Sequence, residues 1–85
     1  MARSVVTVIG QGRRITGVSK DTGKPYDFCR TAFSFIDSYG NADVAVIVLH
    51  GDQLDEFAVQ VGNSYEAIVN KVNRQYYIDL IGPVG

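Results

Sequence analysis

Cations and aromatic rings alternate between Lys20 and Phe35, in the most distinctive stretch of the sequence. Lys20 and Lys24 flank Asp21-Thr22-Gly23, which has the composition of a tight turn because a short polar side chain precedes a residue free to take positive φ. The residues that follow are aromatic and β-branched, as is typical of a strand, and they include Arg30. Cations hold phosphates and ring faces stack on unpaired bases of any sequence, so this combination favours binding of single-stranded nucleic acid. The rings concerned are Tyr26, Phe28, Phe33 and Phe35.

The face of the strand on which each ring lies decides whether that ring can bind a base. Successive side chains of a strand point to opposite faces, which places Tyr26, Phe28 and Arg30 together. Phe33 and Phe35 fall on the other face. An arginine beside two rings indicates that the first face is solvated. The alternative is plain core packing, because burial of a ring contributes about 1.5–3 kcal/mol.

The formal charge is unevenly distributed, although the net charge is −1. Residues 1–30 contain six cations and two acids, whereas residues 31–85 contain two cations and seven acids. This asymmetry predicts one basic face on an acidic body. The alternative is a chance fluctuation in a short chain. The cations expected to meet phosphates are Arg13, Arg14, Lys20, Lys24 and Arg30.

The remaining segments supply the elements of a small β-barrel. β-Branched residues from Ser4 to Ile9 predict a strand that Gly10-Gln11-Gly12 interrupts, which indicates a kinked first strand. The segment from Asp52 to Ala58 has the spacing of one or two helical turns, with Asp52 as the N-cap. Further strands are expected at residues 13–19 (continuing the first), 27–36, 43–49, 62–69 and 76–81, with a turn at 37–41 and a polar loop at 70–75.

Together these elements predict a single all-β domain over residues 1–85. The expected fold is a five-stranded Greek-key barrel of the oligonucleotide-binding (OB) type, with a kinked first strand and one short helix after the third strand. An SH3-like barrel is the alternative. Tyr39 lies in the turn after the second strand, where it is either a stacking ring or a ring folded onto the sheet. A domain of 85 residues with a strand as apolar as Val44 to Leu49 favours burial of further surface in a homodimer.

The turn and the strand after it resemble a known family. Gly17-Val18-Ser19-Lys20 followed by Gly23-Lys24-Pro25-Tyr26 is similar to the hairpin of the small single-stranded DNA-binding (helix-destabilising) proteins of filamentous phages. The resemblance implies homodimers that coat replicative single-stranded DNA cooperatively in the cytoplasm of a bacterial host. It continues through Ser34–Asp37 and Gly40-Asn41, and returns at Gly62–Glu66 and Tyr77–Leu80.

The resemblance also implies roles for individual residues. Lys20 corresponds to a phosphate contact, Lys24 to a loop cation and Tyr26 to a stacking ring. Phe28 stands where the family has an apolar residue that faces DNA, and Phe35 stands at the position of a tyrosine that stacks on bases. The span from Tyr26 to Asp37 is one residue longer here than in the family. Phe28 and Phe35 therefore share a face only if a β-bulge intervenes.

Other classes of function have little support. His50 and Cys29 are the only histidine and cysteine, so they form neither an internal disulfide nor a zinc site, which needs about four N or S ligands. A Cys29–His50 pair of nucleophile and base is a formal alternative, but a cysteine among aromatics in a strand behaves as a small hydrophobe. The acids Asp52, Asp55 and Glu56 lack the spacing of a calcium loop. We therefore expect no enzyme, metal, cofactor or small-molecule substrate.

The expected partners are single-stranded DNA and a second copy of the chain. No apolar run approaches the ~20 residues that span a bilayer, and the N-terminus lacks a signal-peptide pattern, so we expect no membrane segment. A single cysteine suits a reducing cytoplasm. Two alternatives stay open: single-stranded RNA as the ligand, and a barrel used as a protein-interaction or oligomerisation module. In the second alternative a partner buries Tyr26, Phe28 and Phe35.

Overall fold

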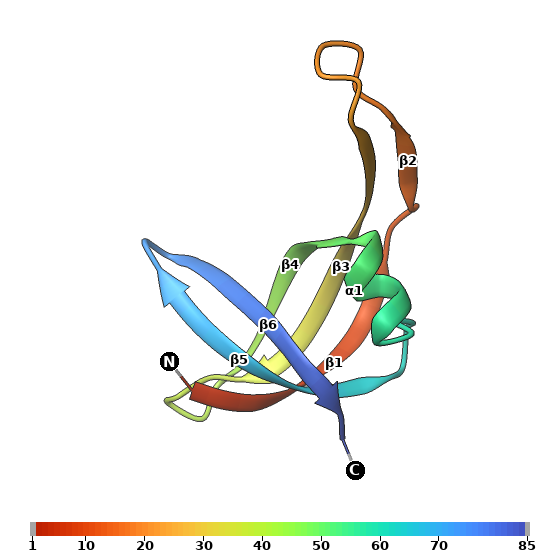
Figure 1. The fold of residues 1–85 in the computed structure, drawn as a ribbon. Helices are drawn as coiled ribbons and strands as arrows, with labels where there is room; N and C mark the ends of the chain where they lie inside the picture. The colour runs from red at the N-terminus through yellow and green to blue at the C-terminus, as the bar shows by residue number, and fades with distance from the viewer. Residues whose placement is uncertain (1, 85) are drawn as a thin grey trace.

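The chain folds into one antiparallel sheet with a single short helix in the described residues, 2–84 of the computed structural model (Figure 1). This confirms the all-β class and the short helix after the third long strand. The helix, α1, spans Gly51–Glu56. The strands are β1 (Ala2–Gln11), β2 (Ile15–Val18), β3 (Pro25–Ile36), β4 (Ala42–His50), β5 (Ser64–Val72) and β6 (Gln75–Pro83).

β3 organises the sheet, because strands pair with it on both edges. β4 runs along one edge, in unbroken register from Phe28 opposite His50 to Ile36 opposite Ala42. β1 and β2 follow one another along the other edge, so they form one line that is interrupted at residues 12–14. The predicted kink is therefore a complete break, and the described residues contain six strands where five were expected. A register shift between Val8 and Gly10 adds a bend within β1.

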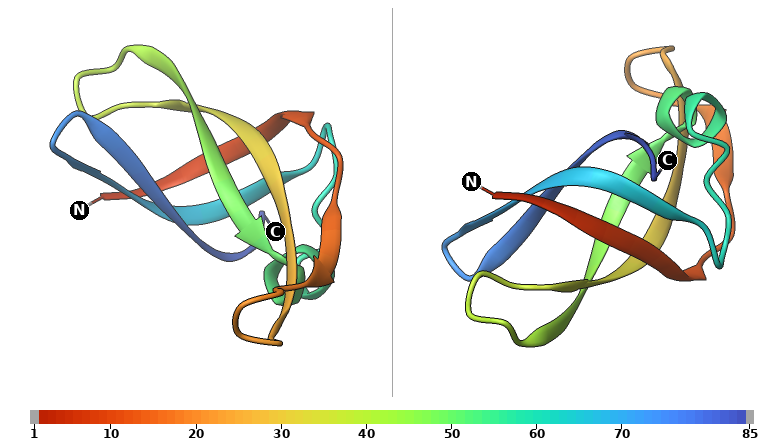
Figure 2. Two further views of the ribbon diagram at one scale, coloured as in Figure 1. Left: turned by 90° about the horizontal axis from the view of Figure 1, so that it is seen from above. Right: turned by 90° about the horizontal axis from the view of Figure 1, so that it is seen from below.

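The sheet curls but stays open at one seam. β5 pairs with β1, and β6 pairs with β5, which gives the order β2-β3-β1-β5-β6 with β4 beside β3. Figure 2 shows the curl that brings β4 and β6 toward one another, and side chains from both strands line a groove of about 390 Å³. No ladder joins β4 to β6 within residues 2–84. The predicted barrel is thus an open one, without hydrogen-bonded closure.

The core lies on the concave face of this sheet. Alternation along β3 sends Cys29, Phe33 and Phe35 inward, and each is buried. They meet buried residues from every long strand and from the segment around α1, so one contiguous core supports the fold. The other members of this core are Val6, Val8, Leu49, Leu54, Val59, Tyr65, Ala67 and Ile78.

Two predicted boundaries are wrong for local reasons. The helix begins at Gly51 with His50 as its N-cap residue, rather than with Asp52, and the side-chain oxygen of Gln53 accepts a hydrogen bond of 3.2 Å from the His50 backbone N–H. The predicted loop at 70–75 is a two-residue turn, because β5 continues to Val72 and β6 begins at Gln75. Both turn residues, Asn73 and Arg74, have positive φ, as the tightest β-hairpins require. No helix among residues 2–84 is long and apolar enough to cross a membrane.

Candidate nucleic-acid interface

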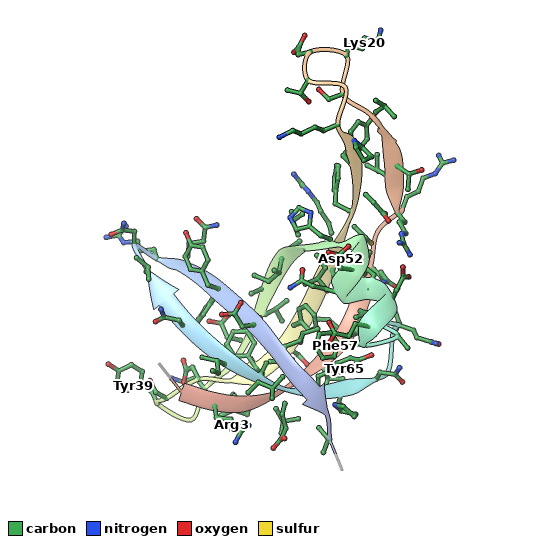
Figure 3. The ribbon with its side chains drawn as sticks, viewed as in Figure 1. Arg3, Lys20, Tyr39, Asp52, Phe57 and Tyr65 are labelled. Atoms are coloured by element: carbon green, nitrogen blue, oxygen red, sulfur yellow. The ribbon has the colours of Figure 1, made fainter. Side chains whose placement is uncertain are left out.

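A ribbon of two strands projects from the body of the sheet (Figure 1). We call residues 15–28, which comprise β2, the turn and the start of β3, the arm. Ile15 pairs with Phe28 at its base and Val18 pairs with Pro25 near its tip. The backbone N–H of Ser19 donates to the Lys24 carbonyl at 2.9 Å, which closes the turn. Figure 3 shows Lys20 at the outer end of the arm, so this cation stands away from the acidic body.

Tyr26 lies over a glycine on the opposite strand of the arm. Gly17 is its cross-strand partner, and a β-carbon on Gly17 would overlap the Tyr26 phenol. A side chain on Gly17 would therefore have to displace the end of the Tyr26 ring. It is still 43% exposed. The neighbouring Phe28 ring is half-buried, with its centroid 6.2 Å away and its plane tilted by 46°. The arm thus presents a supported but accessible ring.

Arg30 continues this outer face beyond the arm. It is exposed, and Val48 of β4 lies beside it in register. Tyr26, Phe28 and Arg30 therefore occupy alternate positions of one strand on one face, as alternation predicts. Two rings and one cation lie along this line without a change of face.

The assignment of Phe35 as a base-stacking ring is wrong. It is only 4% exposed, and its ring packs edge-on to Tyr76 with the centroids 4.8 Å apart. A bulge would be needed to move it to the face of Phe28, but β3 and β4 pair without a register shift over this span. The core interpretation thus holds for Phe35 and for its neighbour Phe33, whereas Tyr26 remains accessible.

Arg14 differs from the other cations because two carboxylates hold it. Its Nε donates to Asp27 Oδ1 at 2.7 Å, and its Nη1 donates to Asp55 Oδ1 at 2.9 Å. Two carboxylates therefore offset its charge, and we no longer expect Arg14 to contact a phosphate. The structure gives no ion-pair partner among residues 2–84 to the remaining cations of this end, which are all exposed: Arg13, Lys20, Lys24 and Arg30.

Arg14 stabilises the charged forms of Asp27 and Asp55, and both carboxylates stabilise the charged form of Arg14. The hydrogen bond that Arg14 donates to Asp27, followed by the one it donates to Asp55, raises the pKa of Arg14 above its ordinary value. In return, the hydrogen bond from Arg14 lowers the pKa of the Asp27 carboxyl and also that of the Asp55 carboxyl. The arrangement therefore stays ionised at neutral pH.

Tyr39 is exposed but lies far from the arm. Its side chain is 88% exposed in the turn between β3 and β4, so it is not folded onto the sheet. Asp37 Oδ1 accepts hydrogen bonds of 2.9 Å from the backbone N–H groups of Tyr39 and Asn41, which order that turn. Figure 3 places Tyr39 and Lys20 at opposite ends of the molecule. The structure thus separates Tyr39 from the other candidate residues.

Sequence reasoning missed three residues that shape the site. Gly17 supports Tyr26, Asp55 binds Arg14, and Gly51 lets α1 approach the arm, because a β-carbon there would overlap the Asp27 carboxylate. Only Gly17 carried a signal in the sequence, as part of the hairpin motif. Asp55 lies 41 residues from Arg14, and no local pattern joins the two.

A second exposed surface lies beside the first. Val44, Val46 and Val48 alternate on the outer face of β4, where their side chains are 52%, 62% and 47% exposed. We call these three residues the valine stripe. It adjoins Arg30 through Val48 and carries no charge of its own. Aliphatic side chains neither stack on bases nor bind phosphates, so this surface has a different chemistry from the arm.

Within residues 2–84 no three potential metal-ligating side chains gather at one place. No family model matches the chain, and no significant match was found among curated proteins or among solved structures.

Proposed function

We propose that the chain binds single-stranded DNA in a sequence-tolerant manner through the arm and the adjoining outer face of β3. The observation that carries this proposal is the accessible ring of Tyr26, held over Gly17 between exposed cations. A base stacks on the ring, and Lys20, Lys24 and Arg30 meet the phosphates on either side. Stacking of this kind accepts any base, because every base has a π-face.

Charge distribution supports local binding by a chain whose net charge is −1. Four cations without an ion-pair partner in residues 2–84 lie at the arm and its base, whereas seven of the nine acids belong to the body. A single strand that follows the arm avoids most of those acids. With roughly three or four phosphate contacts per protomer, the log–log salt slope for single strands should be about −2 to −3.

The biological setting follows from the resemblance of the hairpin to the phage proteins. In that setting the chain coats replicative single-stranded DNA as cooperative homodimers in the host bacterial cytoplasm, without a cofactor and without catalysis. The valine stripe supports the homodimer, because exposed aliphatic surface on a strand with one unpaired edge is stabilised when a second copy covers it. Sedimentation at micromolar concentration should give twice the monomer mass. A monomer would remove the homodimer from the proposal.

The test is a titration of intrinsic tyrosine fluorescence with poly-dT, poly-rU and duplex DNA at one salt concentration. Poly-dT should quench the fluorescence with the highest affinity, and duplex DNA should bind weakly because its bases are already stacked. Equal affinity for duplex would show a purely electrostatic contact. Preference for poly-rU would reassign the ligand to RNA. Absence of binding to every polymer would refute the function.

A second function, an oligomerisation or protein-interaction module, is favoured by the valine stripe. In that case the arm rings would be covered by protein in the assembled state. Val46→Asp places a charge in the middle of the stripe and should block assembly. If the resulting monomer still binds poly-dT, the two surfaces act separately and nucleic-acid binding stands. If the native oligomer shields Tyr26 from iodide quenching, the interaction module is the better description.

A further inference from the structure

The arm is the least supported part of the sheet. Within residues 2–84, β2 pairs only with β3, and β4 accompanies β3 only from Phe28 onward, so a third strand is missing along most of the arm. A ribbon of two strands is marginally stable by itself in water. The chain that leads into the arm, residues 12–14, lies outside the strands. The direction of the arm relative to the body therefore depends on the continuous strand β3 and on contacts beside it.

Arg14, Asp27 and Asp55 supply such a contact, and we call these three residues the clamp. Arg14 precedes β2, and Asp27 belongs to β3, so the first ion pair ties the two legs of the arm together. Asp55 belongs to α1, so the second ion pair ties the arm to the helix. The helix is in turn anchored by Leu54, which is 6% exposed in the core. The clamp thus joins the arm to a helix that is anchored in the core.

The approach of the helix depends on a glycine. A β-carbon on Gly51 would overlap the Asp27 carboxylate and crowd the Arg14 guanidinium. The first residue of α1 therefore sits directly against the clamp, and the planar guanidinium reaches both carboxylates across this contact. Arginine is suited to this role because its fork of donors binds carboxylates in a fixed geometry.

We propose that Arg14 is a positioning residue for the DNA-binding arm and not a phosphate ligand. This inference rests on the proposed function. A guanidinium that moved to a phosphate would leave Asp27 and Asp55 unpaired beside the DNA. Left in place, it holds the arm in one direction before DNA arrives, which lowers the ordering cost of binding. Tyr26 and the free cations are then presented as one surface.

The experiment compares two variants of α1 that change the charge equally. Asp55→Asn removes the helix side of the clamp, and Glu56→Gln changes the exposed neighbour outside it. Relative to Glu56→Gln, Asp55→Asn should weaken poly-dT binding about two- to fivefold, the range set by an exposed ion pair. The salt slope should be equal in the two variants. If Arg14 were a phosphate ligand, removal of the competing Asp55 carboxylate would instead strengthen binding.

A second measurement needs no DNA. Hydrogen exchange of residues 15–28 should be faster in Asp55→Asn and in Arg14→Lys than in Glu56→Gln, while exchange of the core strands stays unchanged. Equal exchange in all variants, or equal or tighter DNA binding by Asp55→Asn, would overturn the positioning role. Failure of the wild-type protein to bind poly-dT would instead refute the proposed function, and the exchange rates would still decide whether the clamp orders the arm.

Discussion

The Tyr26 hydroxyl occupies the space above Gly17 that a side chain on that residue would need. The two residues are cross-strand partners, so the Tyr26 ring packs on the backbone of Gly17. The ring covers backbone that the missing side chain leaves exposed. This one contact accounts for a tyrosine that is held in place without being buried.

Replacement of Gly17 should disturb the position of the Tyr26 ring. Gly17→Ala should displace Tyr26 and weaken poly-dT binding by part of the ~1–3 kcal/mol that one stacked base contributes. Near-UV circular dichroism should report the changed environment of the ring. Gly82→Ala in β6 is the matched control, because open space surrounds that glycine. Binding that is unaffected by Gly17→Ala would show that the position of the ring is unimportant.

The contributions of the Tyr26 ring and of the Lys20 charge to DNA binding should differ in their salt dependence. Tyr26→Ala should weaken poly-dT binding by about 1–3 kcal/mol with little change in the salt slope, and Tyr26→Phe should retain most of the binding, because stacking needs the ring only. Lys20→Ala should lower affinity modestly and flatten the slope by about 0.7, the effect of one phosphate contact. The control is Tyr39→Ala at the far end of the molecule. If Tyr26→Ala lowers thermal stability sharply and its folded fraction binds normally, Tyr26 is a core residue.

Thr31 offers a test of the core. Its hydroxyl is fully buried and has no hydrogen-bond partner in the described residues. Thr31→Val removes that unsatisfied group at nearly constant shape, so the free energy of unfolding in urea should rise by about 1 kcal/mol. Thr7→Val should do the reverse, because the Thr7 hydroxyl shares a hydrogen bond of 2.8 Å with that of Ser64. A loss of stability in both variants would mean that Thr31 has a partner, such as a buried water.

The clamp predicts a response to acid. Arg14 lowers the folded-state pKa values of Asp27 and Asp55 below those of the unfolded chain. Such groups stabilise the fold above the unfolded pKa of about 3.9 and lose that contribution as the pH falls through the folded values. The protection of the arm amides, expressed relative to the intrinsic exchange rate at each pH, should therefore decrease below about pH 4. The double variant Asp27→Asn/Asp55→Asn should show a smaller decrease, and an equal one would assign the effect to other acids such as Asp43.

Alternation along one strand predicted more of the site than the resemblance did. It placed Tyr26 and Arg30 on an outer face and Phe33 on the opposite face, and their exposure agrees with that placement. The resemblance assigned Phe35 to the outer face across one additional residue. The uninterrupted register with β4 leaves no bulge to absorb that residue, so Phe35 enters the core.

Contacts between distant segments explain what the sequence could not predict. The pairing of Arg14 with Asp55 depends on how α1 docks against the arm, and a count of charges treats Arg14 as free. The helix itself was expected from spacing, but the close packing of its first residue, Gly51, on the clamp was not. The exposure of the valine stripe likewise follows from the position of β4 at the edge of the sheet, which its apolar sequence does not reveal.

The open seam gives the body a mechanical freedom that a closed barrel lacks. β4 and β6 meet through side chains alone, around a groove lined by Val46, His50, Tyr76 and Ile78 among others. The distance between β4 and β6 can therefore change, because no backbone hydrogen bond of a strand ladder between them has to break in residues 2–84. Stiffness is concentrated instead in the part of β3 from Thr31 to Ser34, which is paired on both edges. The arm extends β3 and not β6, and a change in the separation of β4 and β6 leaves its pairing with β2 intact.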